Sequence, residues 1–186
     1  MKSILFITGN PDKLREFREM LKDVTLEHKD VDLPELQGEP EEIAKEKAKL
    51  AAKLTGQTCI VEDTCLSFDA WQGLPGPYIK HFIKKLGAAR TAEILHASSD
   101  NHKARAMTTI GYCEPGKEPV CIAGMTEGKI LSARGTKNFL KGWDQIFSPT
   151  GDQRTFAEME PEEKHSFSQR GKAINAFKRF LLQSDN

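Results

Sequence analysis

The strongest constraint on the fold of this chain lies at its start, where a short apolar run leads directly into a helix start. Residues 4–7 have the pattern of a buried strand. Asn10 is a favoured N-cap and Pro11 a favoured first helical residue. Leu14 and Phe17 then lie on one face of the helix, because they are three residues apart. This strand–turn–helix order predicts an α/β domain.

The rest of the chain continues the alternation of strands and helices. Further strands are predicted near residues 24–26, 58–61, 106–112, 120–123 and 129–131, and further helices after Pro40, after Pro77, around Ile94 and around Phe177. The helix after Pro40 is expected to turn one stripe to the core, made of Ile43, Leu50, Ala51 and Leu54. The pattern predicts a mixed α/β fold, and 186 residues suit a single domain, residues 1–186.

Charge and composition exclude several classes of protein. The 27 Lys and Arg residues balance 27 Asp and Glu residues, whereas DNA-binding and membrane-surface proteins need a positive excess. No apolar run reaches the ~18 residues of a membrane span, and residues 4–7 are too few for a signal peptide. The cysteines form no CxxC pair, which favours reduced, structural thiols in a cytoplasmic chain (Cys59, Cys65, Cys113 and Cys121). Neither a nucleic-acid nor a membrane partner is expected.

The turn between the first strand and the first helix is the first candidate binding site. Free backbone N–H groups and the positive end of a helix dipole attract phosphate at such a turn. Gly9 permits a close backbone approach, and Thr8, Asn10 and Lys13 supply donors. An ordinary capped helix with a surface lysine explains the same residues, and neither a Walker A nor a Rossmann glycine pattern is present.

A lysine stands at an unusual position in the helix after Pro40. Lys47 falls inside the apolar stripe, although a lysine is rarely buried without a partner. An anionic partner reached from the core side would explain this position. A side chain that extends past its apolar neighbours to water would explain it equally well.

Two adjacent carboxylates, Glu62 and Asp63, stand with Thr64 at the end of an apolar strand signal. Ligands of α/β proteins gather at the carboxyl ends of strands, and paired carboxylates suit Mg²⁺. Glu39, just before the helix at Pro40, is a further candidate ligand. Two exposed loop carboxylates are the alternative interpretation, and the strand context favours the metal site.

The last third of the chain combines an aromatic surface with directional polar groups. Gly142-Trp143-Asp144 places a ring beside a carboxylate, and Lys164 and Ser168-Gln169-Arg170 add cations and donors. A pocket that recognises a nucleotide base needs these groups. A core tryptophan and a helix-surface arginine are the alternative interpretation.

Seven segments, in order along nearly the whole chain, together resemble one family. They are residues 8–13, 33–40, 61–66, 73–80, 142–144, 157–159 and 168–170. The chain resembles the inosine triphosphate pyrophosphatases, the Ham1-like enzymes acting on noncanonical purine nucleoside triphosphates. The resemblance implies a two-lobed α/β fold with a mixed sheet, flanking helices and a central cleft, acting as a homodimer. It also implies hydrolysis of ITP, dITP and XTP to the monophosphate and pyrophosphate with Mg²⁺, or with Mn²⁺ as a substitute.

The resemblance assigns roles to individual residues. Catalysis is implied for Asp63, Glu62 and Lys47, and metal binding for Glu39, Glu62 and Asp63. Substrate contacts are implied for Thr8, Gly9, Asn10, Pro11, Asp12, Lys13, Lys47, Asp63, Thr64, Lys80, Lys141, Gly142, Trp143, Asp144, Lys164, Ser168, Gln169 and Arg170. Within this set, Thr8, Asn10 and the lysines at 13, 47, 80 and 164 resemble the triphosphate contacts, and residues 143, 144 and 168–170 face the base. The four lysines are expected to form a locally basic cleft opposite an acidic metal site, despite the zero net charge.

Two departures from the family pattern bear on specificity. Lys141 precedes Gly142 where the family usually has Phe, so the stacking ring is missing there and Phe139 is a candidate replacement. Gln169 stands where the family usually has His, and a Gln amide can accept from the 6-amino group of ATP as well as donate to a 6-oxo group. Two alternatives stay open: a related house-cleaning pyrophosphatase with a different or broader nucleotide preference, and a catalytically silent nucleotide-binding regulator.

Overall fold

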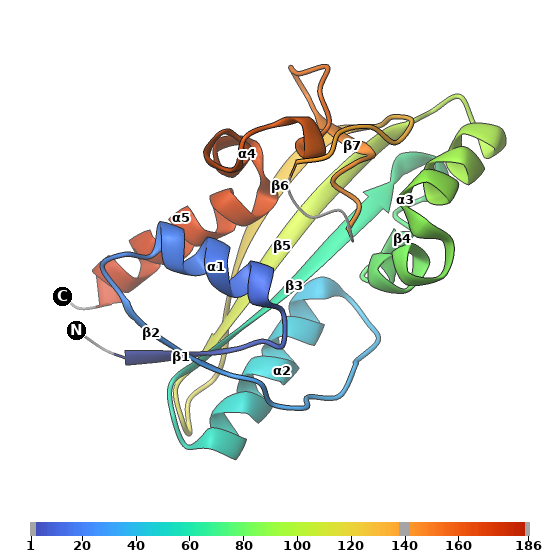
Figure 1. Cartoon of the computed structure of the whole chain (residues 1–186). Coiled ribbons are helices and arrows are strands. Elements are labelled where there is room, and N and C mark those ends of the chain that lie inside the picture. Colours follow the sequence, from blue (N-terminus) through green and yellow to red (C-terminus); the bar gives the residue numbers. More distant parts are fainter. Residues whose placement is uncertain (1–2, 138–141, 185–186) are drawn as a thin grey trace. The chain divides into compact units, whose positions relative to one another are not determined.

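The computed structural model describes residues 3–137 and 142–184. The chain forms two compact units, of which unit 1 takes in residues 1–63, 108–124 and 173–186, and unit 2 residues 64–107 and 125–172. The strands of the described residues are β1 (Ser3–Ile7), β2 (Thr25–Lys29), β3 (Cys59–Phe68), β4 (Pro75–Gly76), β5 (Lys103–Cys113), β6 (Val120–Ile130) and β7 (Phe147–Pro149). They belong to one sheet in the order β2-β1-β3-β5-β6-β7, with β4 paired to β3 (Figure 1).

The sheet is mixed, which confirms the predicted mixed α/β fold. β1 pairs parallel with β2 and β3, whereas β4 and β7 run antiparallel to their partners. The helices are α1 (Pro11–Met20), α2 (Pro40–Thr55), α3 (Ile79–Ser98), α4 (Pro161–Phe167) and α5 (Gln169–Ser184), with short 3₁₀ helices η1 (Asp69–Trp71) and η2 (Phe156–Glu158). The strand signals predicted at 120–123 and 129–131 fall in one continuous strand, β6, so only the break predicted between them was wrong.

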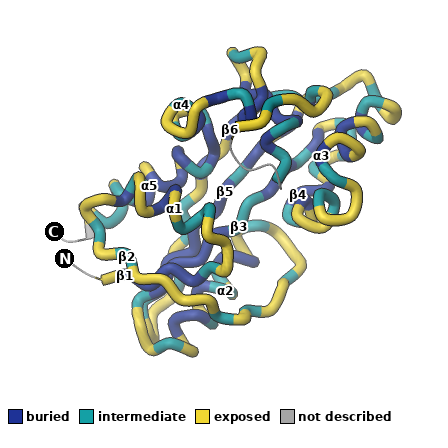
Figure 2. The backbone as a smooth tube through the Cα atoms, in the orientation of Figure 1, coloured by how far each residue is buried: buried dark blue, intermediate teal, exposed yellow. Residues whose placement is uncertain are grey.

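Residues 4–7 of β1 are all buried, which explains why the sequence of this strand is apolar rather than alternating (Figure 2). Leu5 and Ile7 pack against α2 in one cluster of unit 1. Ile4 and Phe6 point the other way and pack against α1 and α5, where the rings of Phe6 and Phe17 have centroids 4.3 Å apart. This strand therefore fixes the position at which α1 begins.

α2 contacts the sheet through small side chains rather than the large ones predicted. Ala44 and Ala48 are fully buried, whereas Leu54 is 59% exposed and Leu50 is half-buried. A Cβ added to Gly111 of β5 would lie 2.4 Å from the carbonyl oxygen of Ala44, so the helix and the strand are too close to admit a leucine. The predicted stripe was therefore wrong at its two leucines.

Unit 2 has its own core, built from β3, α3, β5, β6, β7 and η2. Phe68, Phe147 and Phe156 are fully buried in it. α3 is interrupted at Gly87, whose φ of 79° and ψ of 164° are not helical. The interruption explains why the sequence predicted two helices here, since each part keeps its own apolar stripe.

The cysteines form no disulfide in the structure (Cys59, Cys65, Cys113 and Cys121). Burial raises the pKa of the Cys59 and Cys113 thiols, which keeps them protonated and unreactive at neutral pH. The expected structural role of these thiols agrees with this burial. None of the helices within residues 3–137 and 142–184 combines the length and apolarity that a membrane crossing requires.

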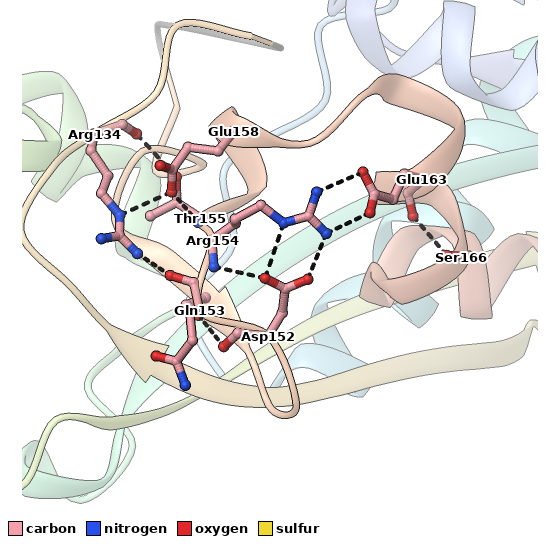
Figure 3. Close-up of polar contacts among 9 residues, drawn as sticks. Arg134, Asp152, Gln153, Arg154, Thr155, Glu158, Glu163 and Ser166 are labelled. Carbon is pink, nitrogen blue, oxygen red and sulfur yellow. Dashed lines mark hydrogen bonds and ion pairs between the residues drawn. The ribbon is translucent and has the colours of Figure 1, made fainter.

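An ion-pair network on unit 2 ties the loop before η2 to α4 (Figure 3). Arg154 lies between two carboxylates, with its guanidinium 2.7 Å from Asp152 Oδ2 and 3.1 Å from Glu163 Oε2. Arg134 pairs with Glu158 at 2.9 Å in the same view. Hydrogen bonds from Arg154 hold the pKa of Asp152 at about 2, below its ordinary value of 3.8.

Because the pKa of Asp152 is lowered on folding, its pairing stabilises the fold above pH ~4 and loses that effect as the pH falls towards 2. The expected result is that Asp152→Asn lowers Tm at pH 5 to 7, and that this deficit shrinks between pH 4 and pH 2. Thermal melts across this range measure it, with Glu162→Gln, an exposed carboxylate of α4, as the control that shows no such convergence. A deficit that stays constant down to pH 2 would contradict the assigned role.

Candidate active site

The turn between β1 and α1 is held by its own side chains. Asn10 is the N-cap of α1, and its Oδ1 accepts from the backbone N–H groups of Asp12 at 2.9 Å and Lys13 at 3.3 Å. The Thr8 hydroxyl accepts from the Asn10 backbone N–H at 3.1 Å. These backbone donors are engaged within the turn, so the prediction that they are free for an anion was wrong. The donors left for an anion are side-chain groups of Thr8, Asn10 and Lys13.

Gly9 and Pro11 complete this turn and are both exposed. Pro11 is the first residue of α1 and has no N–H group to offer. Gly9 stands beside the carboxylate of Asp30, whose Oδ2 would lie 2.9 Å from a Cβ added at Gly9. A negative side chain therefore already borders the turn, and it weakens any attraction of an anion by the backbone alone.

Lys13 reaches from α1 to the buried Glu62. Its Nζ donates to the Glu62 backbone carbonyl at 3.0 Å and forms an ion pair with the Glu62 carboxylate. Glu62 is 6% exposed, and a carboxylate buried to this degree is stable only when it is paired. The two residues are therefore one unit, in which each side chain fixes the position of the other.

Lys47 has the anionic partner that its place in the apolar stripe indicated. Its Nζ lies 3.0 Å from Asp63 Oδ1, and its side chain is 13% exposed. Glu35, an exposed residue of the loop before α2, lies 3.6 Å from the same nitrogen. Glu35 was not among the predicted site residues, because no local sequence pattern links that loop to the helix.

The two carboxylate oxygens of Asp63 differ in their contacts, and Oδ1 is the one that Lys47 contacts. Oδ2 of Asp63 is buried and has no hydrogen-bond partner among the described residues. A buried acceptor without a donor is unfavourable in the empty protein, and sites that bind a ligand or an ion are where such atoms persist. Asp63 is therefore the strongest candidate for contact with a water molecule or a cation.

Glu62 and Asp63 lie inside a strand, so the predicted strand end at this position was wrong. β3 continues to Phe68, but its parallel pairing with β1 covers only Cys59 and Ile60. The two carboxylates lie just beyond the last residues paired with β1. The end of β1, rather than of β3, thus marks the edge that the sequence pattern indicated.

The predicted metal ligands are not gathered in one cluster. Among the described residues, no group of three or more His, Cys, Asp and Glu side chains is arranged to hold a metal ion. Glu62 is engaged by Lys13, and Glu39 is the exposed N-cap of α2, where its backbone N–H donates to Glu42 at 3.4 Å. Asp63 Oδ2 nevertheless fits Mg²⁺, which takes one or two carboxylates and completes its shell with water and phosphate oxygens.

The base-side residues of unit 2 centre on a buried ion pair. Lys164 of α4 is 4% exposed, and its Nζ lies 2.6 Å from Oδ2 of Asp144, which is 7% exposed. The same ammonium stands 5.8 Å from the centroid of the Phe156 ring. Trp143 is half-buried and packs edge-on against Phe147, with centroids 5.6 Å apart. Lys164 was expected to contact the triphosphate, and here its charge is held by a carboxylate.

The turn from α4 to α5 is tightly fixed. The Ser168 backbone N–H donates to the Lys164 carbonyl at 2.8 Å, and its hydroxyl accepts from the Gly171 backbone N–H at 3.0 Å. A Cβ at Gly171 would lie 1.9 Å from the His165 carbonyl oxygen, so only glycine fits there. Arg170 donates to the Thr64 hydroxyl at 3.4 Å. This turn carries three of the predicted base-side residues on a rigid backbone.

The remaining predicted contacts are Lys80, Gly142 and Lys141. Lys80 is an exposed residue in the first turn of α3. Gly142 is half-buried beside Trp143. Lys141 and its proposed neighbour Phe139 lie outside the described residues.

Known proteins are similar to this chain over nearly its whole length. A sequence model of the Ham1 family matches residues 4–180. The inosine triphosphate pyrophosphatase of Puccinia graminis f. sp. tritici is 46% identical over 181 residues, which cover 92% of this chain and 93% of that protein. The structure of a HAM1 protein from Coxiella burnetii matches with a TM-score of 0.87 at 29% identity, over 98% of this chain and 100% of that one.

A second solved structure is similar in the same way. It is a nucleoside-triphosphatase, or dITP/XTP pyrophosphatase, from Mycobacterium abscessus, with a TM-score of 0.73 at 31% identity. The match covers 94% of this chain and 98% of that one. The family model spans nearly the whole chain. The 46% sequence identity to the Puccinia protein is far higher than two proteins that share only a fold would have. The chain therefore belongs to the Ham1 family.

Proposed function

We propose that this chain is a nucleoside triphosphate pyrophosphatase that hydrolyses ITP, dITP and XTP to the monophosphate and pyrophosphate. The relatives support the substrate class, since one is named an inosine triphosphate pyrophosphatase and another a dITP/XTP pyrophosphatase. The structural observation that supports the chemistry is the arrangement of the two carboxylate oxygens of Asp63. Its Oδ1 is held 3.0 Å from Lys47, and its buried Oδ2 has no hydrogen-bond partner among the described residues.

The triphosphate is assigned to the cations and side-chain donors of unit 1. Lys13 and Lys47 each hold a carboxylate in the structure, so phosphate oxygens would share ammonium groups that are already in position. The Thr8 hydroxyl and the Asn10 amide add uncharged donors at the start of α1. The family resemblance assigns Lys80, an exposed residue of α3, to the same role.

The metal is assigned to Asp63, with Glu39 as a second carboxylate and Glu62 as a neighbour that keeps Lys13 in place. The observation that supports this assignment is the buried Oδ2 of Asp63, which has no hydrogen-bond partner among the described residues. Bound Mg²⁺, with Mn²⁺ as a substitute, would neutralise charge on the triphosphate and polarise its phosphorus centres.

The chemical step assigned to this chain's own residues is proton removal from water. The Asp63 carboxylate accepts one proton of the attacking water while the water oxygen forms a bond to the α-phosphorus. The bond from the α-phosphorus to the bridging oxygen breaks, and that oxygen leaves with pyrophosphate. Lys47 holds the Asp63 carboxylate in position, and with Lys13 it stabilises the charge that builds on the leaving group.

The base is assigned to unit 2, to Trp143, Asp144 and the turn between α4 and α5. Lys164 holds the Asp144 carboxylate at 2.6 Å, which fixes it as an acceptor for an N–H group. Ser168 and Arg170 stand on the rigid turn beside this pair. The homodimer and the cytoplasmic location stay predictions from the resemblance and from the thiols.

Pyrophosphate release from ITP, XTP, dITP, GTP, ATP and UTP, with and without Mg²⁺, tests this function. The expected result is that ITP, XTP and dITP give higher kcat/KM than UTP, and that chelation of Mg²⁺ removes the activity with every nucleotide. Preference for UTP would favour a pyrimidine-directed pyrophosphatase. Binding of ITP with no release from any nucleotide would overturn the assignment in favour of a nucleotide-binding regulator.

A further inference from the structure

The side chain of Gln169 has a buried hydrogen-bond acceptor for which the described residues provide no donor. Gln169 is the first residue of α5 and is 3% exposed. Its Oε1 is buried and has no hydrogen-bond partner among the described residues. Burying an amide oxygen without a hydrogen-bond donor costs free energy, and a bound ligand with an N–H group would remove that cost.

The backbone around Gln169 is fixed, so the point from which its side chain extends is held in place. Ser168 bonds to the preceding turn through its N–H and caps the following one through its hydroxyl. Gly171 packs against the His165 carbonyl with no room for a side chain. The same turn begins at Lys164, whose ammonium holds Asp144 at 2.6 Å. Gln169 therefore belongs to the group of residues assigned above to the base.

A carboxamide can pair with a purine in two ways. Its oxygen can accept from N1–H of a 6-oxo purine while its N–H₂ donates to O6. Alternatively, its oxygen can accept from the 6-amino group while its N–H₂ donates to N1. A side chain that only donates at this position would face the 6-amino group donor to donor and reject it. An amide has no such mismatch with either base.

We propose that Oε1 of Gln169 accepts a hydrogen bond from the purine base and thereby extends the substrates of this chain to 6-amino purine triphosphates such as ATP. This inference rests on the proposed function, and it deepens that function by naming the substrate class. The reaction is unchanged, since water attacks the α-phosphorus and pyrophosphate leaves. Only the base edge that the enzyme accepts is different.

The first test uses the native protein alone. Purine riboside triphosphate lacks both the N1–H and the 6-amino group, so it offers no N–H group on that edge. Its kcat/KM is expected to be roughly 10-fold below those of both ITP and ATP, which is the fold-change that one hydrogen bond between uncharged groups carries. Equal values for the three nucleotides would overturn the proposal.

The second test compares variants. Gln169→His is expected to raise the ratio of kcat/KM for ITP over ATP roughly 10-fold, by lowering the value for ATP. Gln169→Met, similar in shape but without an acceptor, is expected to lower both values together. Gln183→His, at an exposed position of the same helix, should leave the ratio unchanged. Melting curves identify a variant that fails to fold, and for that case the test with purine riboside triphosphate decides.

The outcomes separate this inference from the function on which it rests. No pyrophosphate from ITP with the native protein would overturn the proposed function itself. Release from ITP, with an ITP over ATP ratio that does not change in a folded Gln169→His protein, would overturn only the role of Gln169. Native activity on ATP no higher than on UTP would do the same.

Discussion

Asp63→Asn should lower kcat for pyrophosphate release from ITP by ~100-fold or more, the range expected for loss of a general base. The amide keeps the shape of the side chain and an oxygen for Lys47, which lies 3.0 Å from Oδ1, but it cannot take a proton from water. Melting temperature should therefore change little, and titration with ITP should still show binding. Steady-state kinetics with saturating Mg²⁺ measures the loss.

The matched control for this variant is Glu118→Gln, which also changes a carboxylate to its amide. Glu118 contacts Lys49, two residues from Lys47 on α2, but its side chain is 85% exposed. An exposed ion pair contributes little, so the control should keep native kcat and native stability. A kcat for folded Asp63→Asn within a few-fold of native would remove Asp63 from the mechanism.

Asp144→Ala should destabilise the protein by about 3–5 kcal/mol, the cost of removing one partner of a buried ion pair. The Lys164 ammonium is 4% exposed and would lose the carboxylate that lies 2.6 Å away. Because both partners are buried, the expected effect exceeds that of an exposed surface pair. Urea denaturation at neutral pH measures the free energy of unfolding.

The double variant Asp144→Leu with Lys164→Met distinguishes a lost pair from a damaged core. Replacing both charges with apolar groups removes the buried charge altogether, so most of the stability should return although base recognition does not. A single variant that loses less than about 1 kcal/mol would show that the ammonium reaches water and that the pair resembles a surface salt bridge.

The sequence predicted best what depends on neighbouring residues. Asn10 and Pro11 start α1 as expected, because a cap and a first helical residue act within one turn. Lys47 was recognised as unusual for a similar reason, since helical spacing alone placed it among apolar side chains. Its partner Asp63 was on the candidate list, and the structure joins the two.

What the sequence did not predict depends on contacts between distant segments. Gly111 and Ala44 together allow α2 to lie close to β5. The sequence of α2 alone does not predict this close approach, because Gly111 lies in a distant segment. β3 passes through Glu62 and Asp63 because neighbouring strands hold it extended, although acidic residues disfavour strands. The N–H groups of the first turn were thought free, because the geometry of the Asn10 cap does not follow from its identity alone.

The balance of charge has a more specific meaning in the structure than in the sequence. The lysines were expected to face an acidic metal site, but Lys13, Lys47 and Lys164 each contact a carboxylate directly. Buried charge of either sign is stable only when it is paired in this way. The 27 basic and 27 acidic residues thus include pairs formed inside the candidate site, where a nucleotide would share ammonium groups already in place.

Hydrolysis of ITP in ¹⁸O-labelled water with Mg²⁺ tests the central claim most directly, because it shows which phosphorus the water attacks. Mass spectrometry of the products should find the label in inosine monophosphate and none in pyrophosphate. That result is expected if water activated by Asp63 attacks the α-phosphorus. Formation of inosine diphosphate with labelled inorganic phosphate, or the label in pyrophosphate, would contradict it.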